Sequence, residues 1–214
     1  MGNLALINFS ICFAMLILQL GWAFEPTTYT SNFQYEIANV IREIPVPHNF
    51  TSIDGSCAYS RSDGVETFQL LNPDANRVEI RIHNKYSHGT HVFHGEVQIF
   101  PPLNDECLMQ VFGSSRPGHA TLFMLRGFNQ SEGSLKRYNQ EVLATCVYNR
   151  WVDVRIVHAQ NRRIRVYIDR VKVGEWPDTD YNKTNYFKYG VYGTLGTDNA
   201  QAQWRNVRYH ATTS

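Results

Sequence analysis

The sequence predicts an all-β protein, a sandwich of two antiparallel sheets. Three observations predict this class. Short runs rich in aromatic and β-branched residues recur along the chain, turn-forming residues separate them, and no long helical repeat lies between them. The chain has 214 residues, which suits one domain of this class after an N-terminal leader is removed.

The first 23 residues are predicted to be a secretory signal peptide. Residues 11–20 are apolar except for Gln19, a run too short to span a bilayer, and small residues follow it. Residues 24–46 are predicted to be a leader that packs along the domain. Ile37 and Val40 begin a helical spacing there that permits a short helix. Residues 47–210 form the predicted domain.

Secretion gives other residues a role. Asn49, Asn129 and Asn182 each begin a glycosylation triplet. We therefore expect a glycoprotein of the secretory pathway, destined for the extracellular space (the apoplast of a plant) or the vacuole.

The cysteines also bear on an oxidising compartment. Cys12 leaves with the signal peptide, so Cys57, Cys107 and Cys146 remain. One disulfide and one free thiol are expected, and the sequence leaves the pairing open.

Composition narrows the partners. Lys and Arg number 20 against 19 Asp and Glu, so the net charge of +1 argues against a nucleic-acid or membrane-surface protein built on a general basic field. After signal cleavage we expect no membrane partner, and we expect a monomer. No cofactor is expected. His88, His91, His94 and His119 lack a strict metal-ligand spacing, so no metal site is predicted.

Strands are predicted wherever such a run is bounded by turn residues. They are residues 78–83, 91–100, 107–112, 121–127, 134–138, 151–158, 163–168, 171–176, 186–192 and 201–209. Turns are predicted at Asn72-Pro73, Pro101-Pro102, Pro117-Gly118 and Asp169-Arg170.

The strand at residues 186–192 (YFKYGVY) organises the candidate site. Alternation puts Tyr186, Lys188 and Tyr192 on one face, and largely apolar side chains on the other. The polar face either meets water, as in an ordinary half-buried strand, or forms the floor of a binding groove.

Two more strands show the same division. Arg77, Glu79, Arg81 and His83 alternate with Val78, Ile80 and Ile82. Paired arginines can hold a carboxylate while Glu79 orients them, although a solvated charged face is the alternative. On residues 107–112, alternation predicts Leu108, Gln110 and Phe112 on one face and Cys107, Met109 and Val111 on the other.

Five segments together resemble the alginate lyase 2 family of polysaccharide lyases, over roughly residues 46–209. Residues 186–192 resemble its YFKxGVY strand and residues 77–81 (RVEIR) its RTExR strand. Residues 109–113 (MQVFG) stand where lyases carry Gln-Ile-His. Residues 148–158 resemble YDRWFRVNVIHD, and residues 204–207 (WRNV) resemble RWKNIK. The resemblance is closest to the plant citrate-binding branch.

The resemblance implies a β-jelly roll with one concave face and assigns roles to residues. Arg77 and Gln110 would neutralise a substrate carboxylate, and Tyr192 would be the catalytic tyrosine that acts as base and acid. Tyr138 would line the groove, by stacking on a sugar or by packing. Phe112 stands where lyases carry a catalytic histidine and cannot accept a proton. Trp151 and Trp204 would be core residues, and His158 a hydrogen-bonded strand histidine.

Three functions are compatible with these residues. The first is binding of a carboxylate-bearing ligand, citrate or a uronate, by Arg77, Arg81, Gln110, Lys188 and Tyr192. The second is a lyase that cleaves an acidic polysaccharide, alginate or glucuronan, by β-elimination. The third is a groove repurposed for a small plant metabolite. The position of Phe112 favours the first.

Overall fold

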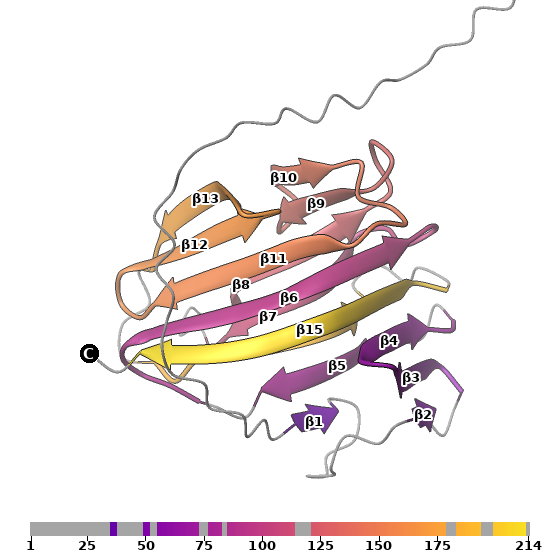
Figure 1. The fold of residues 1–214 in the computed structure, drawn as a ribbon, viewed down its shortest axis with the longest axis horizontal. Coiled ribbons are helices and arrows are strands. Elements are labelled where there is room, and N and C mark those ends of the chain that lie inside the picture. Colours follow the sequence, from indigo (N-terminus) through magenta and orange to yellow (C-terminus); the bar gives the residue numbers. More distant parts are fainter. Residues whose placement is uncertain are drawn as a thin grey trace, which may run out of the picture.

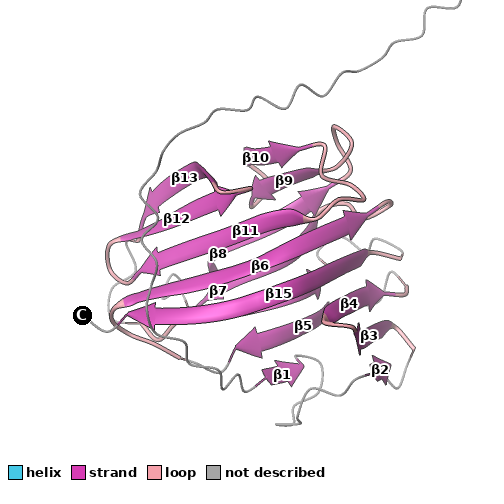
Figure 2. Cartoon of the chain, viewed as in Figure 1, coloured by secondary structure: helices cyan, strands magenta, loops and turns pink. Residues whose placement is uncertain are grey.

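The computed structural model describes residues 35–37, 49–51, 55–72, 77–82, 85–113, 121–178, 183–193 and 199–212. Within these ranges the secondary structure is strand, with turns between strands (Figure 2). No helix there is long and apolar enough to cross a membrane. The predicted all-β sandwich of two antiparallel sheets is confirmed.

Sheet A is the seven-stranded layer. Its order is β1 (Tyr35–Ile37), β5 (Arg77–Ile82), β14 (Tyr186–Tyr192), β7 (Glu106–Phe112), β8 (Thr121–Phe128), β9 (Ser134–Arg137) and β10 (Glu141–Thr145). The segment at residues 186–192 therefore lies inside the sheet, between two strands that are far away in the sequence. This position lets β14 bring side chains from three strands together.

Sheet B is the eight-stranded layer and lies in front of sheet A in Figure 1. Its order is β13 (Val171–Pro177), β12 (Arg163–Ile168), β11 (Val152–Ala159), β6 (Thr90–Phe100), β15 (Gln201–Thr212), β4 (Val65–Leu70), β3 (Cys57–Ser62) and β2 (Asn49–Thr51). The central pairs β11–β6, β6–β15 and β15–β4 join non-consecutive strands, so the register in the middle of the sheet depends on contacts between distant parts of the chain.

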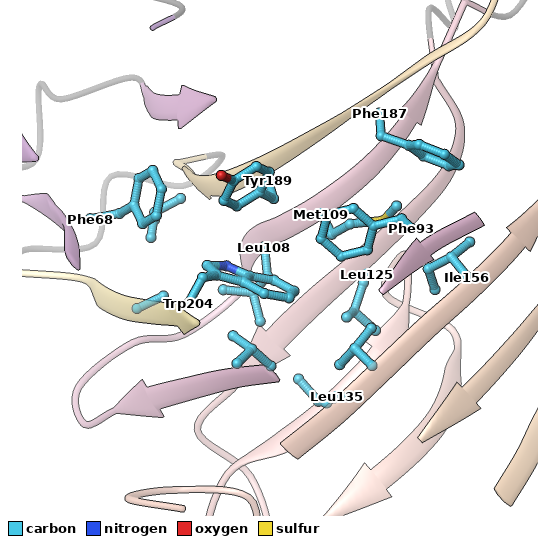
Figure 3. Close-up of a cluster of buried hydrophobic side chains, with 14 of the residues drawn as sticks. Phe68, Phe93, Leu108, Met109, Leu125, Leu135, Ile156, Phe187, Tyr189 and Trp204 are labelled. Atoms are coloured by element: carbon cyan, nitrogen blue, oxygen red, sulfur yellow. The ribbon is translucent and has the colours of Figure 1, made fainter. Parts of the chain in front are cut away.

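The core lies between the two sheets, because each strand turns alternate apolar residues inward. Phe68, Phe93 and Trp204 of sheet B meet Phe187 and Tyr189 of β14 (Figure 3). All five side chains are at most 1% exposed. Ring contacts join the layers, such as Phe93 against Tyr189 at 5.7 Å between centroids. These contacts fix β14 against sheet B and leave its other face outward.

Some local structure differs from the sequence-based expectation. Ile37 belongs to strand β1, which pairs with β5, so the permitted helix does not form at that residue. Val40 lies outside the described residues. A hairpin of β3 and β4 was not predicted, although Asp63 and Gly64, both with positive φ, form its tight turn. Strand β10 was not predicted either.

Candidate functional site

The candidate site lies on the outward face of β5, β14 and β7. Inward residues of these strands, such as Val78, Tyr189 and Val111, belong to the core. Their neighbours along each strand therefore point away from sheet B. We call these outward side chains the polar strip: Arg77, Glu79, Arg81, Tyr186, Lys188, Tyr192, Cys107, Gln110 and Phe112.

Strand register brings the predicted site residues together around β14. Lys188 lies opposite Arg81 of β5 on one side and opposite Gln110 of β7 on the other. Tyr192 lies opposite Arg77. Because neighbouring strands are about 4.8 Å apart, these side chains form one cluster.

Gly190 makes this close approach possible. It lies opposite Glu79, and its φ of 142° falls in a region that side chains with a Cβ rarely adopt. A Cβ atom at this position would lie 2.4 Å from the backbone oxygen of Val78. The pairing of β14 with β7 also shifts register here, between Tyr189 and Tyr192.

This register shift corrects one sequence-based assignment. Alternation predicted Leu108 on the polar face and Cys107 on the core face, but the structure reverses them. Leu108 belongs to the core, while Cys107 lies opposite Tyr192 and Arg126 on the polar side. Irregularities between β7 and both neighbouring strands explain the reversal, because each inserted residue exchanges the two faces. Gln110 and Phe112 keep their predicted face.

Glu79 is the centre of the polar strip. It is only 1% exposed, and its Oε1 accepts a hydrogen bond from Gln110 Nε2. Its Oε2 lies 3.6 Å from Arg77 Nη1 and 3.8 Å from Lys188 Nζ. Three contacts from three strands hold one carboxylate, so Glu79 orients Arg77 and Lys188, whereas the sequence-based prediction paired it with Arg77 and Arg81.

Burial dominates the electrostatics of this cluster. It raises the pKa of Glu79, against the opposing influence of Lys188, Arg77 and Gln110. It lowers the pKa of Lys188, an effect that Glu79 opposes and the two arginines strengthen. Burial also raises the pKa of Cys107 well above its usual value, with Glu79 adding to the shift, so this thiol stays protonated.

Aromatic rings cover the cations. The guanidinium of Arg77 lies 4.1 Å from the centroid of the Tyr192 ring, and that of Arg81 lies 4.0 Å from the Tyr186 ring. Lys188 Nζ lies 4.5 Å from the ring of Phe112. Cations at these positions are stabilised by the negative ring faces. At the position where lyases carry histidine, this protein thus has an apolar cover over a lysine.

The remaining predicted residues lie elsewhere. Tyr138 follows β9, three strands from β14, and its hydroxyl donates to the carbonyl of Thr121 at 3.1 Å. His83 and His119 lie outside the described residues. Sequence reasoning placed Tyr186 on the polar face but not in the site. It also left Cys107 out of the site, because strand alternation alone does not reveal a bulge.

The described histidines have structural partners. His158 is fully buried, with Nδ1 2.8 Å from the Tyr86 hydroxyl and Nε2 2.9 Å from Asp178 Oδ2, which confirms it as a hydrogen-bonded strand histidine. His91 stacks on Tyr86 at 3.6 Å, and burial lowers its pKa to about 4. Among the described residues no group of three or more His, Cys, Asp or Glu side chains could hold a metal ion.

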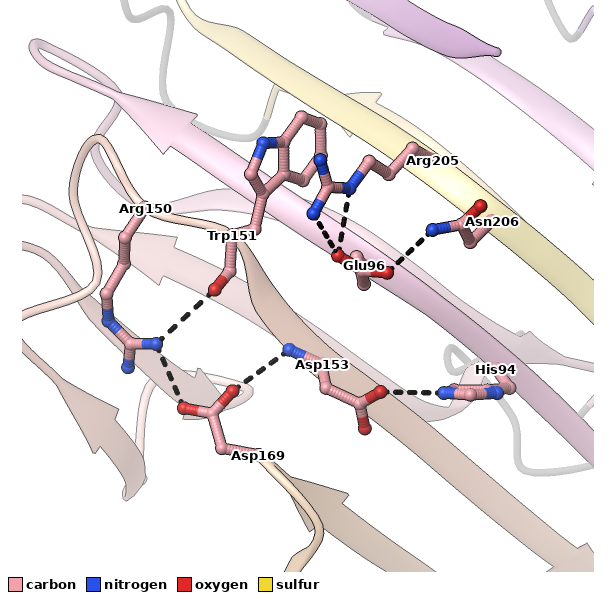
Figure 4. A network of polar contacts seen from close by, with 8 residues as sticks. All are labelled: His94, Glu96, Arg150, Trp151, Asp153, Asp169, Arg205 and Asn206. Carbon is pink, nitrogen blue, oxygen red and sulfur yellow. Dashed lines mark hydrogen bonds and ion pairs between the residues drawn. The ribbon is translucent and has the colours of Figure 1, made fainter.

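Two further expectations change. Trp204 is in the core as predicted, but Trp151 is half-buried on the outside of sheet B, with its ring 4.2 Å from the Arg205 guanidinium (Figure 4). Cys57 and Cys107 are both buried free thiols, whereas Cys146 is disulfide-bonded, so the expected disulfide within this set of three cysteines does not form.

Comparisons with known proteins agree with the fold. A citrate-binding protein of Hevea brasiliensis is 33% identical over 147 residues, which are 67% of this chain and 59% of that protein. The chain thus spans less than two thirds of this relative. No family model matches the chain.

Solved structures of alginate lyases share the jelly-roll architecture. A marine PL7 alginate lyase from Zobellia galactanivorans superposes with a TM-score of 0.59 at 18% identity, over 75% of this chain and 82% of that chain. An alginate lyase of Pseudomonas aeruginosa superposes with a TM-score of 0.59 at 15% identity, over 72% of this chain and 86% of that chain. Alginate lyase AlyC3 in complex with dimannuronate superposes with a TM-score of 0.55 at 15% identity, over 70% of this chain and 75% of that chain. At these identities the likeness shows the fold alone, a jelly-roll sandwich like that of alginate lyases.

Proposed function

We propose that this protein binds a carboxylate-bearing ligand, citrate or a uronate, on the polar strip. The observation that carries the proposal is the charge of the strip. Arg77, Arg81 and Lys188 bring three cationic side chains together beside Glu79, whose carboxylate contacts Arg77 and Lys188, while Glu36 of β1 lies opposite Arg81 in the strand register. The cationic side chains outnumber the carboxyl groups that the register places beside them, so the cluster would attract an incoming carboxylate.

Burial divides the polar strip into a buried layer and an outer contact layer. Glu79, Gln110 and Lys188 are each at most 6% exposed, so they form the buried layer. Arg77 and Arg81 are partly exposed and present their guanidinium groups to the outside. A ligand carboxylate would bind these arginines through paired N–H donors, while Lys188 adds its charge from below.

The relatives agree with this ligand class. The sequence relative is named a citrate-binding protein, and one lyase of the same fold is described with dimannuronate. Citrate and uronates share the carboxylate group. This shared chemistry supports a carboxylate ligand without selecting between them.

Phe112 favours binding over catalysis. β-Elimination requires a group that removes the proton beside the carboxylate, and a phenyl ring cannot do this. Here that ring packs on Tyr186, with 5.1 Å between centroids, and covers Lys188. Phe112 therefore stabilises the cation of Lys188 in the buried layer of the polar strip.

A polysaccharide lyase is the second candidate, because Arg77 and Tyr192 lie together. The guanidinium stacks on the phenol ring, so a carboxylate held by Arg77 would lie beside the Tyr192 hydroxyl. Tyr192 could then remove the proton and return it to the leaving oxygen, while Arg77 stabilises the developing negative charge.

Calorimetric titration of the folded protein with citrate and with a uronate disaccharide tests the first candidate. Arg81→Gln should weaken binding by about tenfold, the effect of losing a charge-assisted contact. Arg150→Gln is the matched control, because that arginine is paired with Asp169 at 2.9 Å on sheet B, and it should bind as wild type. The absence of binding heat with both ligands would refute the proposal.

An ultraviolet assay for unsaturated uronate ends, on alginate and glucuronan, tests the second candidate. We expect a flat signal. A rising signal that disappears in Tyr192→Phe would establish a lyase and replace the binding function.

A further inference from the structure

A second cationic surface lies on the other side of the molecule, on the outward face of sheet B. Arg155 of β11, Arg165 of β12 and Arg208 of β15 each alternate with core residues, so all three point outward. Arg208 is exposed and the other two are half-buried. We call these three residues the arginine patch.

Strand register places the patch around two histidines. His94 of β6 lies opposite Arg155 on one side and opposite Arg208 on the other. His210 lies one outward step beyond Arg208 on the same strand. Because each step between strands is about 4.8 Å, the row from Arg155 through His94 to Arg208 extends over about 10 Å.

Acidic residues of this face already have other side-chain partners (Figure 4). Asp153 accepts from His94 Nε2 at 2.8 Å, and Glu96 accepts from Arg205 at 2.6 Å. At the β13 edge of the same sheet, Glu175 pairs with Arg163 of β12 at 2.6 Å. In the part of the chain that the structure describes, Arg155, Arg165 and Arg208 take part in no ion pair.

The pKa of one histidine reflects the positive charge of the arginine patch. The pKa of His210 is lowered, first by burial and then by its electrostatic interactions with His94, Arg155 and Arg208. The Nε atom of Arg165 is buried and has no hydrogen-bond partner among the described residues. A bound anion would supply the missing partner and relieve the repulsion.

We propose that the arginine patch is a second binding site, for a linear acidic polysaccharide that crosses the strands of sheet B. A sheet that presents an arginine on three of four successive strands matches a polymer with regularly repeated anionic groups.

Other polyanions fit this surface less well. Binding at a membrane surface usually combines cations with inserted apolar side chains. Among the described residues the large exposed hydrophobic ones are Leu71, Val142 and Val171, none of which belongs to the patch. Single-stranded nucleic acid usually stacks its bases on aromatic rings, and on this face Trp151 and Tyr167 already have the guanidinium groups of Arg205 and Arg155 near their rings, at 4.2 Å and 5.9 Å from the centroids.

Affinity electrophoresis of the full protein through gels that contain polygalacturonate tests the proposal. Arg155→Gln combined with Arg208→Gln should weaken retardation by about tenfold at low salt, while Arg150→Gln should migrate as wild type. Citrate titration of the double variant should give the wild-type affinity, because the polar strip is on the other sheet. This separates the two proposals: either can fail without the other.

Heparin carries both sulfate and carboxylate groups, so stronger retardation by heparin than by polygalacturonate would show that the patch also accepts sulfate, and either result supports the site. Unchanged retardation of a folded double variant would overturn the proposal. Equal or stronger binding to anionic phospholipid vesicles or to single-stranded DNA would overturn the assignment to polysaccharide. If the double variant does not fold, the single change Arg208→Glu at the exposed position serves instead, with the same expected loss.

Discussion

The two outward faces of the sandwich use the same kinds of charged side chains in opposite ways. On sheet A, Glu79 and Lys188 pair while their side chains are 1% and 7% exposed. On sheet B, Glu96 and Arg205 pair while theirs are 25% and 38% exposed. A buried ion pair loses its hydration and is costly to disrupt, whereas an exposed one contributes little to stability. The difference indicates that sheet A holds its charges in a fixed arrangement and that sheet B has a solvated network.

Gly190→Ala should have the largest effect, because it disturbs the backbone of the strand that positions the charged side chains of sheet A. Its positive φ and the 2.4 Å approach to the oxygen of Val78 leave no room for a methyl group. We expect a loss of about 4 kcal/mol in the free energy of unfolding, measured with urea, or no folded protein.

Gly95→Ala on β6 is the matched control in sheet B. There a Cβ would meet only side-chain atoms, at 3.1 Å from Val207 and 3.2 Å from Trp204. These neighbours can shift, so a smaller loss is expected. Equal losses in the two variants would show that the glycine of β14 has no special role.

Glu79→Ala should have the next largest effect, because it leaves Lys188 buried without its carboxylate. We expect a loss of about 3 kcal/mol in unfolding free energy, the usual result of breaking one side of a buried pair. Urea unfolding would measure it.

The double change Glu79→Leu with Lys188→Met is the control, since it removes both charges and keeps apolar volume. It should recover much of the stability while abolishing ligand binding. A loss below about 1 kcal/mol in Glu79→Ala would mean that water reaches Lys188, and the contrast between the two faces would no longer hold.

Glu66→Gln examines a buried carboxyl whose described hydrogen-bond partners are tyrosine hydroxyls, in contrast to the cations beside Glu79. Glu66, on the inward side of β4, accepts hydrogen bonds from Tyr59 and from Tyr189, each at 2.9 Å. Burial raises its pKa above the ordinary 4.5, against these two hydrogen bonds and the charge of Arg61. The folded protein therefore binds this proton more tightly than the unfolded chain. The resulting stabilisation is complete below about pH 4.5 and is lost as the pH rises through the folded pKa.

Glutamine removes the ionisation and keeps a hydrogen-bonding group at this position. We therefore expect Glu66→Gln to melt about 2–4 °C above wild type at pH 8, a shift typical of about 1 kcal/mol in a domain of this size. The difference should narrow as the pH falls to 4. A difference that grows on acidification would contradict the assigned direction of the pKa shift.

Much of this architecture could be predicted from local pattern. Residues 77–82 and 186–192 alternate with a period of two, so their strands, faces and polar residues followed from the sequence. The reversed faces of Cys107 and Leu108 could not be predicted, because the irregularity arises from pairing with two strands that are distant in sequence. Local alternation contains no information about such pairing.

Burial was equally hard to predict. Trp151 resembles a core residue in its motif, but it lies on the outside of sheet B, where Arg205 covers it. The depth of Glu79 and Lys188 also depends on packing across three strands. The missed hairpin of β3 and β4 is different, because the Asp63-Gly64 turn was readable from the sequence.

Glu96→Gln should have the smallest effect and completes the contrast. Glu96 accepts from Arg205 and Asn206 on the partly exposed face of sheet B, and these contacts lower its pKa although its burial opposes this. Solvent screens the pair, so we expect a loss of about 0.5 kcal/mol in urea unfolding, which 0.5 M salt should largely remove. The same salt should leave the cost of Glu79→Ala nearly unchanged, because ions cannot enter a site that is 1% exposed. If salt reduced both costs equally, the two faces would not differ in the way that their burial indicates.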